Sequence, residues 1–230
     1  MKAILGATWA AVTLLCGCGG EPEEPKPIPV GALTPAPTGE GWINLLDDAH
    51  QAGWKNITDD LEIFDITAGV LHLHGNTPKP LRYAGYAAER FGDFDLHVEF
   101  KYPAGANSGI FIRMQPGDLD RRGFEVQVQD DFGKPIDKNI CGAIYDVVTP
   151  MYNMCLPAGQ WNSFDIAMHG ALVEITLNGW LVIKADLGQM TMPLGKYKIP
   201  FAELPREGLL TFQDHHSECW YRNVMIKPAT

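Results

Sequence analysis

The chain has 230 residues, of which 46% are hydrophobic and 20% are charged, and its formal net charge is -10. These are ordinary values for a globular protein that is long enough to bury one sizeable core. The negative charge argues against nucleic-acid binding, because phosphate recognition requires clustered lysine and arginine side chains.

The N-terminus has the features of an export signal. A lysine precedes an apolar run at residues 3–15 that is too short to span a membrane. The sequence Leu-Cys-Gly-Cys that ends at Cys18 resembles the lipobox of bacterial lipoproteins, in which the last cysteine is diacylated and becomes the mature N-terminus. We therefore expect a signal peptide at residues 1–17 and a lipid on Cys18. This predicts an exported, lipid-anchored protein of the cell envelope, in the outer membrane or periplasm if the cell is Gram-negative. An ordinary signal peptide that is cleaved nearby is the alternative.

Residues 18–40 are rich in proline, glycine and glutamate and have no apolar periodicity. Such a stretch cannot bury enough surface to offset the entropy of ordering it. We expect a flexible linker, extended by about 3 Å per residue where it is polyproline-like. It would hold a single domain, residues 41–230, away from the lipid membrane.

From residue 41 onward the hydrophobic pattern has a period of two, which is typical of β-strands. The dipeptide Asn178-Gly179 between two such runs predicts a two-residue hairpin. The runs that we expect to form strands are residues 95–102, 109–114, 124–129, 164–168, 173–177, 180–184, 209–213 and 220–226. Many short strands without a long amphipathic helix indicate an all-β sandwich or jelly roll.

The alternation also predicts a polar sheet face. In the run Phe-Glu-Val-Gln-Val-Gln the apolar side chains should enter the core, so that Glu125 and Gln127 point the other way. By the same argument Arg113 leaves the core in a second run, and Gln213 and His215 leave it in a third. The alternation does not show whether these strands are neighbours. The second face of an antiparallel sheet is usually just solvated, but this mixture of amides, arginine and histidine beside one glutamate is more typical of a surface that binds sugars.

Three cysteines follow the linker, namely Cys141, Cys155 and Cys219. An oxidising compartment permits a disulfide, and the spacing favours Cys141 with Cys155. No Cys-x-x-Cys or His-x-x-x-His spacing predicts a zinc site. Apart from His215 and its neighbour, the histidines are scattered, and we expect them to be surface or structural residues: His50, His72, His74, His97 and His169.

An ordered set of motifs resembles the 3-keto-disaccharide hydrolase domain family. The motifs are GWINLLD at 41–47, NSGIFIR at 107–113, GFEVQVQD at 123–130, GAIY at 142–145, WN at 161–162, NG at 178–179, QDH at 213–215 and RNV at 222–224. The resemblance covers roughly residues 41–228. It implies a concanavalin-like jelly-roll sandwich of two antiparallel sheets in a single domain. It also implies substrates that are glycosides or disaccharides already oxidised to a ketone at C3 of the sugar.

The chemistry of such a substrate differs from that of an ordinary glycoside. Retaining glucanases of this fold carry Glu-x-Asp-x-(x)-Glu on one strand, with the two catalytic carboxylates about 5 Å apart, whereas this chain has amides at Gln127 and Gln129. A 3-keto sugar needs one base only, because the ketone acidifies the proton on C2 and the glycosidic oxygen on C1 lies β to the carbonyl. Loss of that proton gives an enolate that expels the aglycone, and water then adds back.

The resemblance and this chemistry together assign roles. Either Glu125 or His215 is the base and the other residue protonates the leaving group, while Arg113 stabilises the enolate. The residues that we expect to bind the substrate are Gln127, Asn107, Gln213 and Tyr145, of which Tyr145 has a second assignment as an acid and a third as a core or rim aromatic.

A few assignments stay open. Asp130 is a surface-turn residue, a partner of Arg113, or, with Asp131, a ligand of a hard cation such as calcium; no cofactor is certain. His216 replaces the glycine that is usual in the family, which predicts a narrower cleft. Because the ketone must be made first, an upstream sugar C3-oxidoreductase is an expected partner.

Two other functions compete with the enzyme. One is a carbohydrate-binding, lectin-like module without turnover, and the other is a scaffold of the laminin-G type that binds proteins in a calcium-dependent way. A carboxylate poised beside a second catalytic group distinguishes the enzyme, because binding modules need only amides and aromatic side chains.

Overall fold

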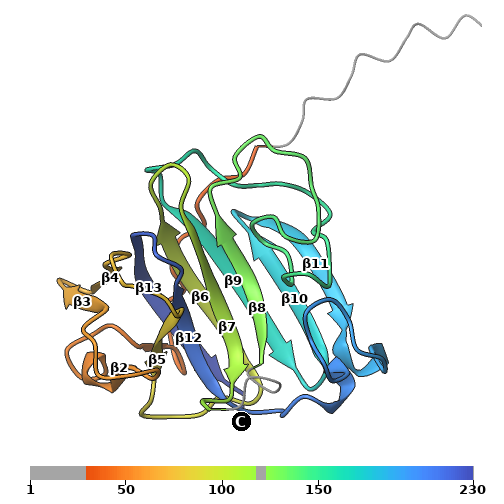
Figure 1. The fold of residues 1–230 in the computed structure, drawn as a ribbon, viewed down its shortest axis with the longest axis horizontal. Coiled ribbons are helices and arrows are strands. Elements are labelled where there is room, and N and C mark those ends of the chain that lie inside the picture. Colours follow the sequence, from red (N-terminus) through yellow and green to blue (C-terminus); the bar gives the residue numbers. More distant parts are fainter. Residues whose placement is uncertain (1–29, 118–122, 230) are drawn as a thin grey trace, which may run out of the picture.

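The computed structural model describes residues 30–117 and 123–229 as an all-β jelly roll of two antiparallel sheets packed face to face (Figure 1). Residues 1–29, which include Cys18, lie outside the described part of the chain, so export and acylation stay predictions. Within the described ranges, no helix is both long and apolar enough to cross a membrane.

The larger sheet has eight strands in the order β11-β10-β9-β6-β13-β4-β3, with β1 also paired to β13. These strands are β1 (Ile43–Asn44), β3 (Phe64–Thr67), β4 (Val70–Leu73), β6 (Phe94–Lys101), β9 (Asn162–His169), β10 (Leu172–Leu177), β11 (Trp180–Asp186) and β13 (Cys219–Pro228). All of its pairings are antiparallel. Loops connect its strands to those of the smaller sheet, as in a jelly roll.

The smaller sheet has five strands in the order β2-β5-β12-β7-β8. They are β2 (Trp54–Asn56), β5 (Arg82–Tyr86), β7 (Asn107–Met114), β8 (Phe124–Gln129) and β12 (Leu209–Asp214). The helical turns of the described chain are short 3-10 segments, namely η1 (Gln51–Gly53), η2 (Leu187–Gln189) and η3 (Phe201–Glu203).

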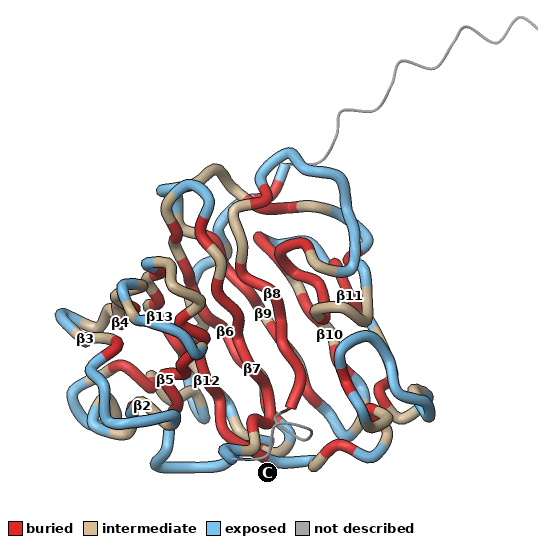
Figure 2. Tube along the Cα trace, in the orientation of Figure 1, coloured by how far each residue is buried: buried red, intermediate tan, exposed pale blue. Residues whose placement is uncertain are grey.

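The core fills the space between the two sheets. The apolar side chains of the alternating runs enter it as predicted, including Ile110 and Ile112 of β7 and Val126 and Val128 of β8. Figure 2 shows β7 and β8 buried along most of their length, whereas several of the connecting segments are exposed. Each fully buried side chain of this size contributes about 1.5–3 kcal/mol to stability.

The hairpin between β10 and β11 forms at the predicted dipeptide. Asn178 and Gly179 have φ angles of 50° and 82°, which is the left-handed pair that a type I′ turn requires. The side chain of Asn178 also accepts from Ser163 N at 2.8 Å and donates to Met154 O at 2.7 Å. The turn therefore both reverses the chain and ties β9 to the loop before it.

The predicted disulfide is not formed, because Cys141, Cys155 and Cys219 are all free and buried thiols. Cys155 is nevertheless a neighbour of Cys141. Burial raises the pKa of the Cys141 thiol well above its ordinary value, and the contact with Cys155 adds to this shift. Spacing thus identified the neighbours correctly but not the bond between them.

The last part of the predicted linker packs against the domain. Ala32 N donates to Asn178 O at 3.0 Å, and Thr34 Oγ1 donates to Asp165 Oδ2 at 2.9 Å. The ordered domain therefore begins before residue 41 in the structure.

Candidate functional site

A cleft of about 250 Å³ opens on the outer face of the smaller sheet. Its lining residues are Leu81, Asn107, Glu125, Gln127, Tyr145, Lys196, Gln213 and His215. All of them except Leu81 and Lys196 belong to the site that the sequence predicted. The structure therefore brings most of the predicted residues together in one place.

The strand order explains why these residues meet. β12, β7 and β8 are neighbours in that order, so their outward-facing side chains form one continuous surface. On β7 and β8, Phe111 lies opposite Glu125 and Asn107 lies opposite Gln129. Gln213 reaches the same surface from β12. The period-two alternation predicted that these side chains point away from the core, and the pairing register places them beside one another.

A glycine on β7 makes room for the carboxylate of Glu125. A Cβ atom at Gly109 would lie 2.5 Å from Glu125 Oε1 and 3.0 Å from its Cγ. The side chain of Glu125 therefore lies over the bare backbone of β7. Only glycine permits this close approach, since any other residue would displace the carboxylate.

The carboxylate is paired with a lysine that the sequence did not indicate. Lys196 Nζ lies 2.5 Å from Glu125 Oε2. The side chain of Glu125 is only 4% exposed, and that of Lys196 is 29% exposed. The same ammonium lies 4.4 Å from the centre of the Tyr145 ring, where it makes a cation–π contact. Because a buried charge is costly without a partner, the ammonium of Lys196 compensates the carboxylate of Glu125 in the cleft.

Two loops cover this outer face and explain why it is not solvated. The segment that contains Tyr145 pairs with the edge of β8: Tyr145 N donates to Glu125 O at 2.9 Å, and Gln127 N donates to Ala143 O at 3.0 Å. The segment that contains Lys196 continues into Tyr197, whose Oη accepts from Glu125 N at 3.3 Å. These contacts turn an open sheet face into a cleft.

The amides of the cleft form a chain beside the carboxylate. One end of the Gln127 amide contacts Asn107 Oδ1 at 3.2 Å and Gln129 Oε1 at 2.9 Å. Its other end lies 3.0 Å from Ser108 O and 3.3 Å from Glu125 Oε1, so the amide in the reverse orientation would donate to these two atoms instead. Lys196 donates to the other carboxylate oxygen of Glu125, Oε2.

Gln213 has an unused acceptor in the cleft. It is 3% exposed, and its Oε1 has no hydrogen-bond partner among the residues that the structure describes. A buried acceptor without a partner costs about 1–3 kcal/mol. A hydroxyl group of a ligand would satisfy it.

The turn after β12 sets the position of His215. Asp214 is buried and accepts from His216 N at 2.9 Å and from Thr77 Oγ1 at 3.2 Å. The ring of His216 bonds to Thr77 O at 2.8 Å through Nδ1, and it does not line the cleft. The predicted narrowing of the cleft by His216 is therefore wrong. Its φ of 61° explains why a glycine suits this position.

Arg113 lies outside the cleft, and its predicted role at the enolate is wrong. Its guanidinium donates to Gly92 O at 2.9 and 3.1 Å, to Gly170 O at 3.0 Å and to Asp93 Oδ1 at 3.0 Å. Burial lowers the pKa of Arg113, an effect that Asp93 partly offsets. The physical reason is a register shift opposite the end of β7, where Arg113 has a φ of 56° and the alternation fails.

Asp130 and Asp131 make structural hydrogen bonds. Asp130 Oδ2 accepts from Gly105 N at 2.9 Å, and the buried Asp131 accepts from Cys141 N at 2.9 Å. Asp130 does not contact Arg113, whose carboxylate partner is Asp93. Among the described residues, the group whose side chains have metal-ligand spacing does not include either aspartate.

Comparison with known proteins places this geometry in context. The model of the family described as "3-keto-alpha-glucoside-1,2-lyase-like domain" matches residues 41–227. A protein of Bacteroides thetaiotaomicron named 3-keto-disaccharide hydrolase is 25% identical in an alignment that is 227 positions long. The alignment covers 82% of this chain and 78% of that protein.

Two solved structures from Parabacteroides distasonis, each described as a candidate glycosyl hydrolase, share the fold. One is 27% identical with a TM-score of 0.71 and covers 83% of this chain and 95% of that chain. The other is 24% identical with a TM-score of 0.68, and the match covers 82% of this chain and 99% of that chain.

Proposed function

Because this chain belongs to the family of 3-keto-alpha-glucoside-1,2-lyase-like domains, we propose that it is a carbohydrate-acting enzyme that cleaves glycosides oxidised to a ketone at C3 of the sugar. The family membership supports the substrate class. The residues of the cleft support a mechanism of proton abstraction, elimination and hydration.

The observation that carries the proposal is the contact between Glu125 and Lys196 in the cleft. It supplies a buried carboxylate as the base and an ammonium as the stabiliser of negative charge. The nearby carboxylic amides cannot act as a second catalytic carboxylate, so the arrangement does not suit a double displacement. A single base beside a single cation is suited to forming an enolate and stabilising its negative charge.

In the first step Glu125 removes the proton from C2. The electron pair of the C2–H bond forms the C2–C3 double bond, and the ketone oxygen becomes the enolate oxygen. Glu125 loses its charge as it takes the proton, so the ammonium of Lys196 exchanges one negative partner for another. This exchange stabilises the enolate without leaving a buried charge unpaired.

In the second step the enolate reforms the ketone, a C1–C2 double bond forms, and the C1–O bond to the aglycone breaks. His215, which lines the cleft, donates a proton to the departing oxygen. Water then adds across the double bond: its hydroxyl goes to C1, its proton returns to His215, and Glu125 returns a proton to C2. The net reaction is hydrolysis of the glycosidic bond.

The cleft suits a single sugar ring. Its volume of about 250 Å³ is below the range of about 300–1,000 Å³ that is typical of sites for drug-sized ligands. The amides of Gln127 and Asn107 and the unused acceptor of Gln213 are placed to bind hydroxyl groups. The ketone in the substrate must come from a prior oxidation at C3, so an oxidoreductase must act upstream.

The test compares nitrophenyl 3-keto-glucosides with their unoxidised parents, each with and without chelator. We expect release of nitrophenol from the keto compounds only. Release from the parents at a similar rate would contradict the enolate mechanism. Saturable binding of either compound without release would show a carbohydrate-binding module instead of an enzyme.

The location of the protein is a separate part of the proposal. We infer from the lipobox that Cys18 is acylated and that the protein is anchored to a membrane of the cell envelope. Metabolic labelling with a palmitate analogue tests this. Label is expected on the wild-type protein and absent from the Cys18→Ser variant, and equal labelling of the two would contradict it.

A further inference from the structure

The hairpin of β3 and β4 carries a cluster of three metal-ligand side chains on the outer face of the larger sheet. Leu71 and Leu73 of β4 enter the core, so His72 points the other way. Asp65 of β3 lies directly opposite His72, and His74 follows two residues later on the same side. The cleft around Glu125 lies on the smaller sheet, so this cluster is a separate feature of the molecule.

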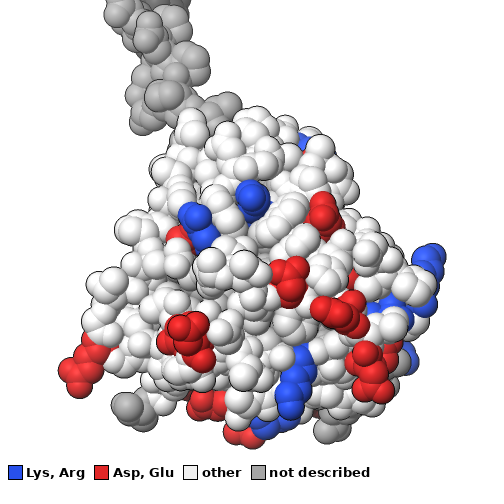
Figure 3. Space-filling view, turned by 90° about the vertical axis from the view of Figure 1, so that its left-hand side faces the viewer, with Lys and Arg blue, Asp and Glu red and all other residues white. Residues whose placement is uncertain are grey.

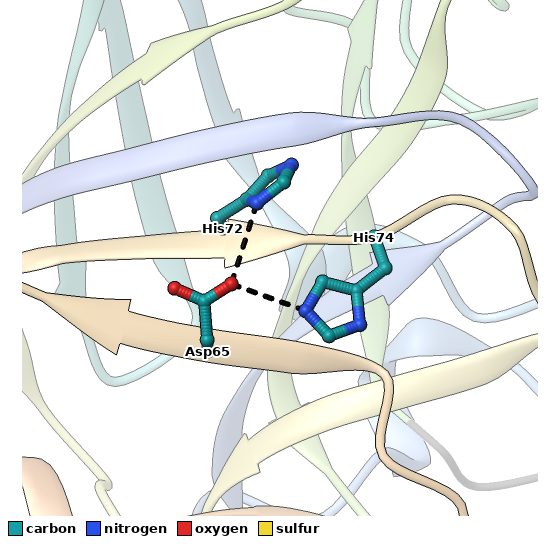
Figure 4. A group of neighbouring side chains, drawn as sticks. All are labelled: Asp65, His72 and His74. Atoms are coloured by element: carbon teal, nitrogen blue, oxygen red, sulfur yellow. Dashed lines mark hydrogen bonds and ion pairs between the residues drawn. The ribbon is translucent and has the colours of Figure 1, made fainter.

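The two histidines converge on one carboxylate oxygen (Figure 4). Asp65 Oδ2 lies 3.1 Å from His74 Nε2 and 3.4 Å from His72 Nδ1. The ligand atoms of the three side chains all lie within 4.8 Å of one another. In a tetrahedral zinc site with bonds of about 2.1 Å, neighbouring ligand atoms are about 3.4 Å apart. Both distances to Asp65 are already close to this value, and only the two imidazoles need to move closer together.

Neighbouring residues orient His72 for metal binding. His72 Nε2 lies 3.3 Å from Glu218 Oε1, and the ring stacks on Trp220 with centroids 4.9 Å apart and an interplanar angle of 3°. If Nε2 donates its proton to Glu218, Nδ1 presents a lone pair to the carboxylate of Asp65. Two lone pairs that face each other require a proton or a cation between them. Metal-bound histidines usually donate their second N–H to a carboxylate in this way.

The cluster is open to solvent and lies in a negative environment. The side chains of His72 and His74 are 26% and 24% exposed, and that of Asp65 is 48% exposed. Figure 3 looks onto the side of the molecule at the left of Figure 1, where β3 and β4 lie, and it shows acidic side chains spread over this surface. An ion can therefore reach the three ligand side chains from the solvent.

We propose that Asp65, His72 and His74 form a binding site for a divalent transition-metal ion of the zinc class, with a fourth position open to water. Two imidazoles and one carboxylate are a ligand set that zinc accepts. Calcium and magnesium are a poor match, because they require an oxygen-rich shell of six or more ligands. The sequence did not indicate the site, because the third ligand, Asp65, comes from a different strand than the two histidines.

The test is a calorimetric titration of the full chain, after chelator treatment and dialysis, with zinc chloride. We expect one zinc ion per chain. The variants His74→Gln and Asp65→Asn should each bind at least tenfold more weakly. His169→Gln is the matched control, because His169 Nε2 also lies 3.1 Å from a carboxylate, that of Asp95, but the described residues provide no third ligand there. Its affinity should equal that of the wild type.

Two further measurements separate metal binding from effects on folding. The visible spectrum of the cobalt-substituted protein should show the intense bands of four-coordinate cobalt and lose them in His74→Gln, while the thermal unfolding of the metal-free variants stays cooperative. Glu218→Gln should weaken zinc binding by roughly 10–100-fold. No saturable binding to the wild type, or equal affinity of the wild type, His74→Gln and Asp65→Asn, would overturn the proposal.

Discussion

Glu125 Oε2 and Lys196 Nζ lie 2.5 Å apart although the two residues are 71 positions apart in the sequence. The lysine comes from a loop, and the glutamate comes from the edge strand of the smaller sheet. The carboxylate is almost fully buried and serves as the proton acceptor, and the ammonium supplies the positive charge. Abstraction of a proton next to a ketone requires both groups.

Replacement of Glu125 should abolish the reaction. In Glu125→Gln the base is lost while the shape is kept, so kcat for a 3-keto glycoside should fall by about 10²–10⁴-fold. The measurement is the initial rate of aglycone release. Glu174→Gln is a matched control, since Glu174 also pairs with a lysine, Lys184 at 2.6 Å, but both of these side chains are exposed. Normal turnover by Glu125→Gln would remove this residue from the mechanism.

Replacement of Lys196 should slow the chemical step more than it weakens binding. In Lys196→Met the enolate loses its positive partner, and loss of one such group typically lowers kcat by about 10²–10³-fold. Steady-state kinetics of the 3-keto glycoside measure kcat and KM separately. Lys196→Arg keeps the charge and should recover part of kcat. Equal activity of Lys196→Met and Lys196→Arg would show that the charge has no role in the reaction.

Replacement of Arg113 should affect stability rather than chemistry. Its guanidinium holds the carbonyl oxygens of Gly92 and Gly170 together with the carboxylate of Asp93. Arg113→Met removes the donor to Gly92 O and to Asp93 Oδ1 and leaves Gly170 O with the longer contact to Arg206 Nη1 at 3.4 Å. It should lower the free energy of unfolding by about 2–3 kcal/mol. Urea unfolding measures this loss, and kcat of the folded variant should stay within twofold of wild type. A large loss of kcat without a loss of stability would return Arg113 to the active site.

A methyl group on Gly109 should displace the catalytic carboxylate. The added Cβ would meet Glu125 Oε1 at 2.5 Å, so Gly109→Ala requires the glutamate side chain to move. A displacement of about 1 Å can lower the rate by about a hundredfold. The measurement is kcat of the variant together with its far-ultraviolet circular dichroism. Unchanged kcat would show that the position of Glu125 over β7 does not matter.

Alkaline pH should destabilise the protein through Cys219. Burial raises the pKa of this thiol from 9.0 to about 12. Between these values the unfolded chain loses a proton that the folded chain keeps, so the free energy of unfolding falls as the pH rises, by up to about 1.4 kcal/mol per pH unit for one such group. The stabilisation is fully present below pH 9. Urea unfolding at a series of pH values should give a shallower decline for Cys219→Ala, and identical slopes would contradict the assignment.

Strands with clean alternation could be predicted from the sequence, and those without it could not. Residues 124–129 form β8 within the predicted bounds, and Asn178-Gly179 forms the predicted hairpin. β5 was missed because all of its residues are buried and its sequence, RYAGY, has no polar face to alternate with. The first four strands were also missed, since each is at most four residues long and too short for a period to be recognised.

The candidate site was predictable where it depends on sheet faces and unpredictable where it depends on loops. Glu125, Gln127 and Gln213 follow from alternation, and the structure brings them together through strand order. Lys196 lies in a loop between β11 and β12 with no periodicity, so no local signal identifies it. The same limit explains Arg113, since a left-handed φ angle at that residue ended the alternation that placed it on the polar face.

The most direct test of the enolate mechanism is to follow the C2 hydrogen of the sugar during turnover in deuterium oxide. A 3-keto glucoside is incubated with the enzyme, and the released sugar is examined at once by NMR against the same sugar kept without enzyme. Elimination and hydration predict deuterium at C2 of the released sugar, in excess of the exchange in the control, because the proton on Glu125 exchanges with solvent before a proton is returned to C2. Release of the aglycone with the original C2 proton retained, and with no primary isotope effect for a substrate deuterated at C2, would contradict proton abstraction by Glu125 and point to direct displacement at C1.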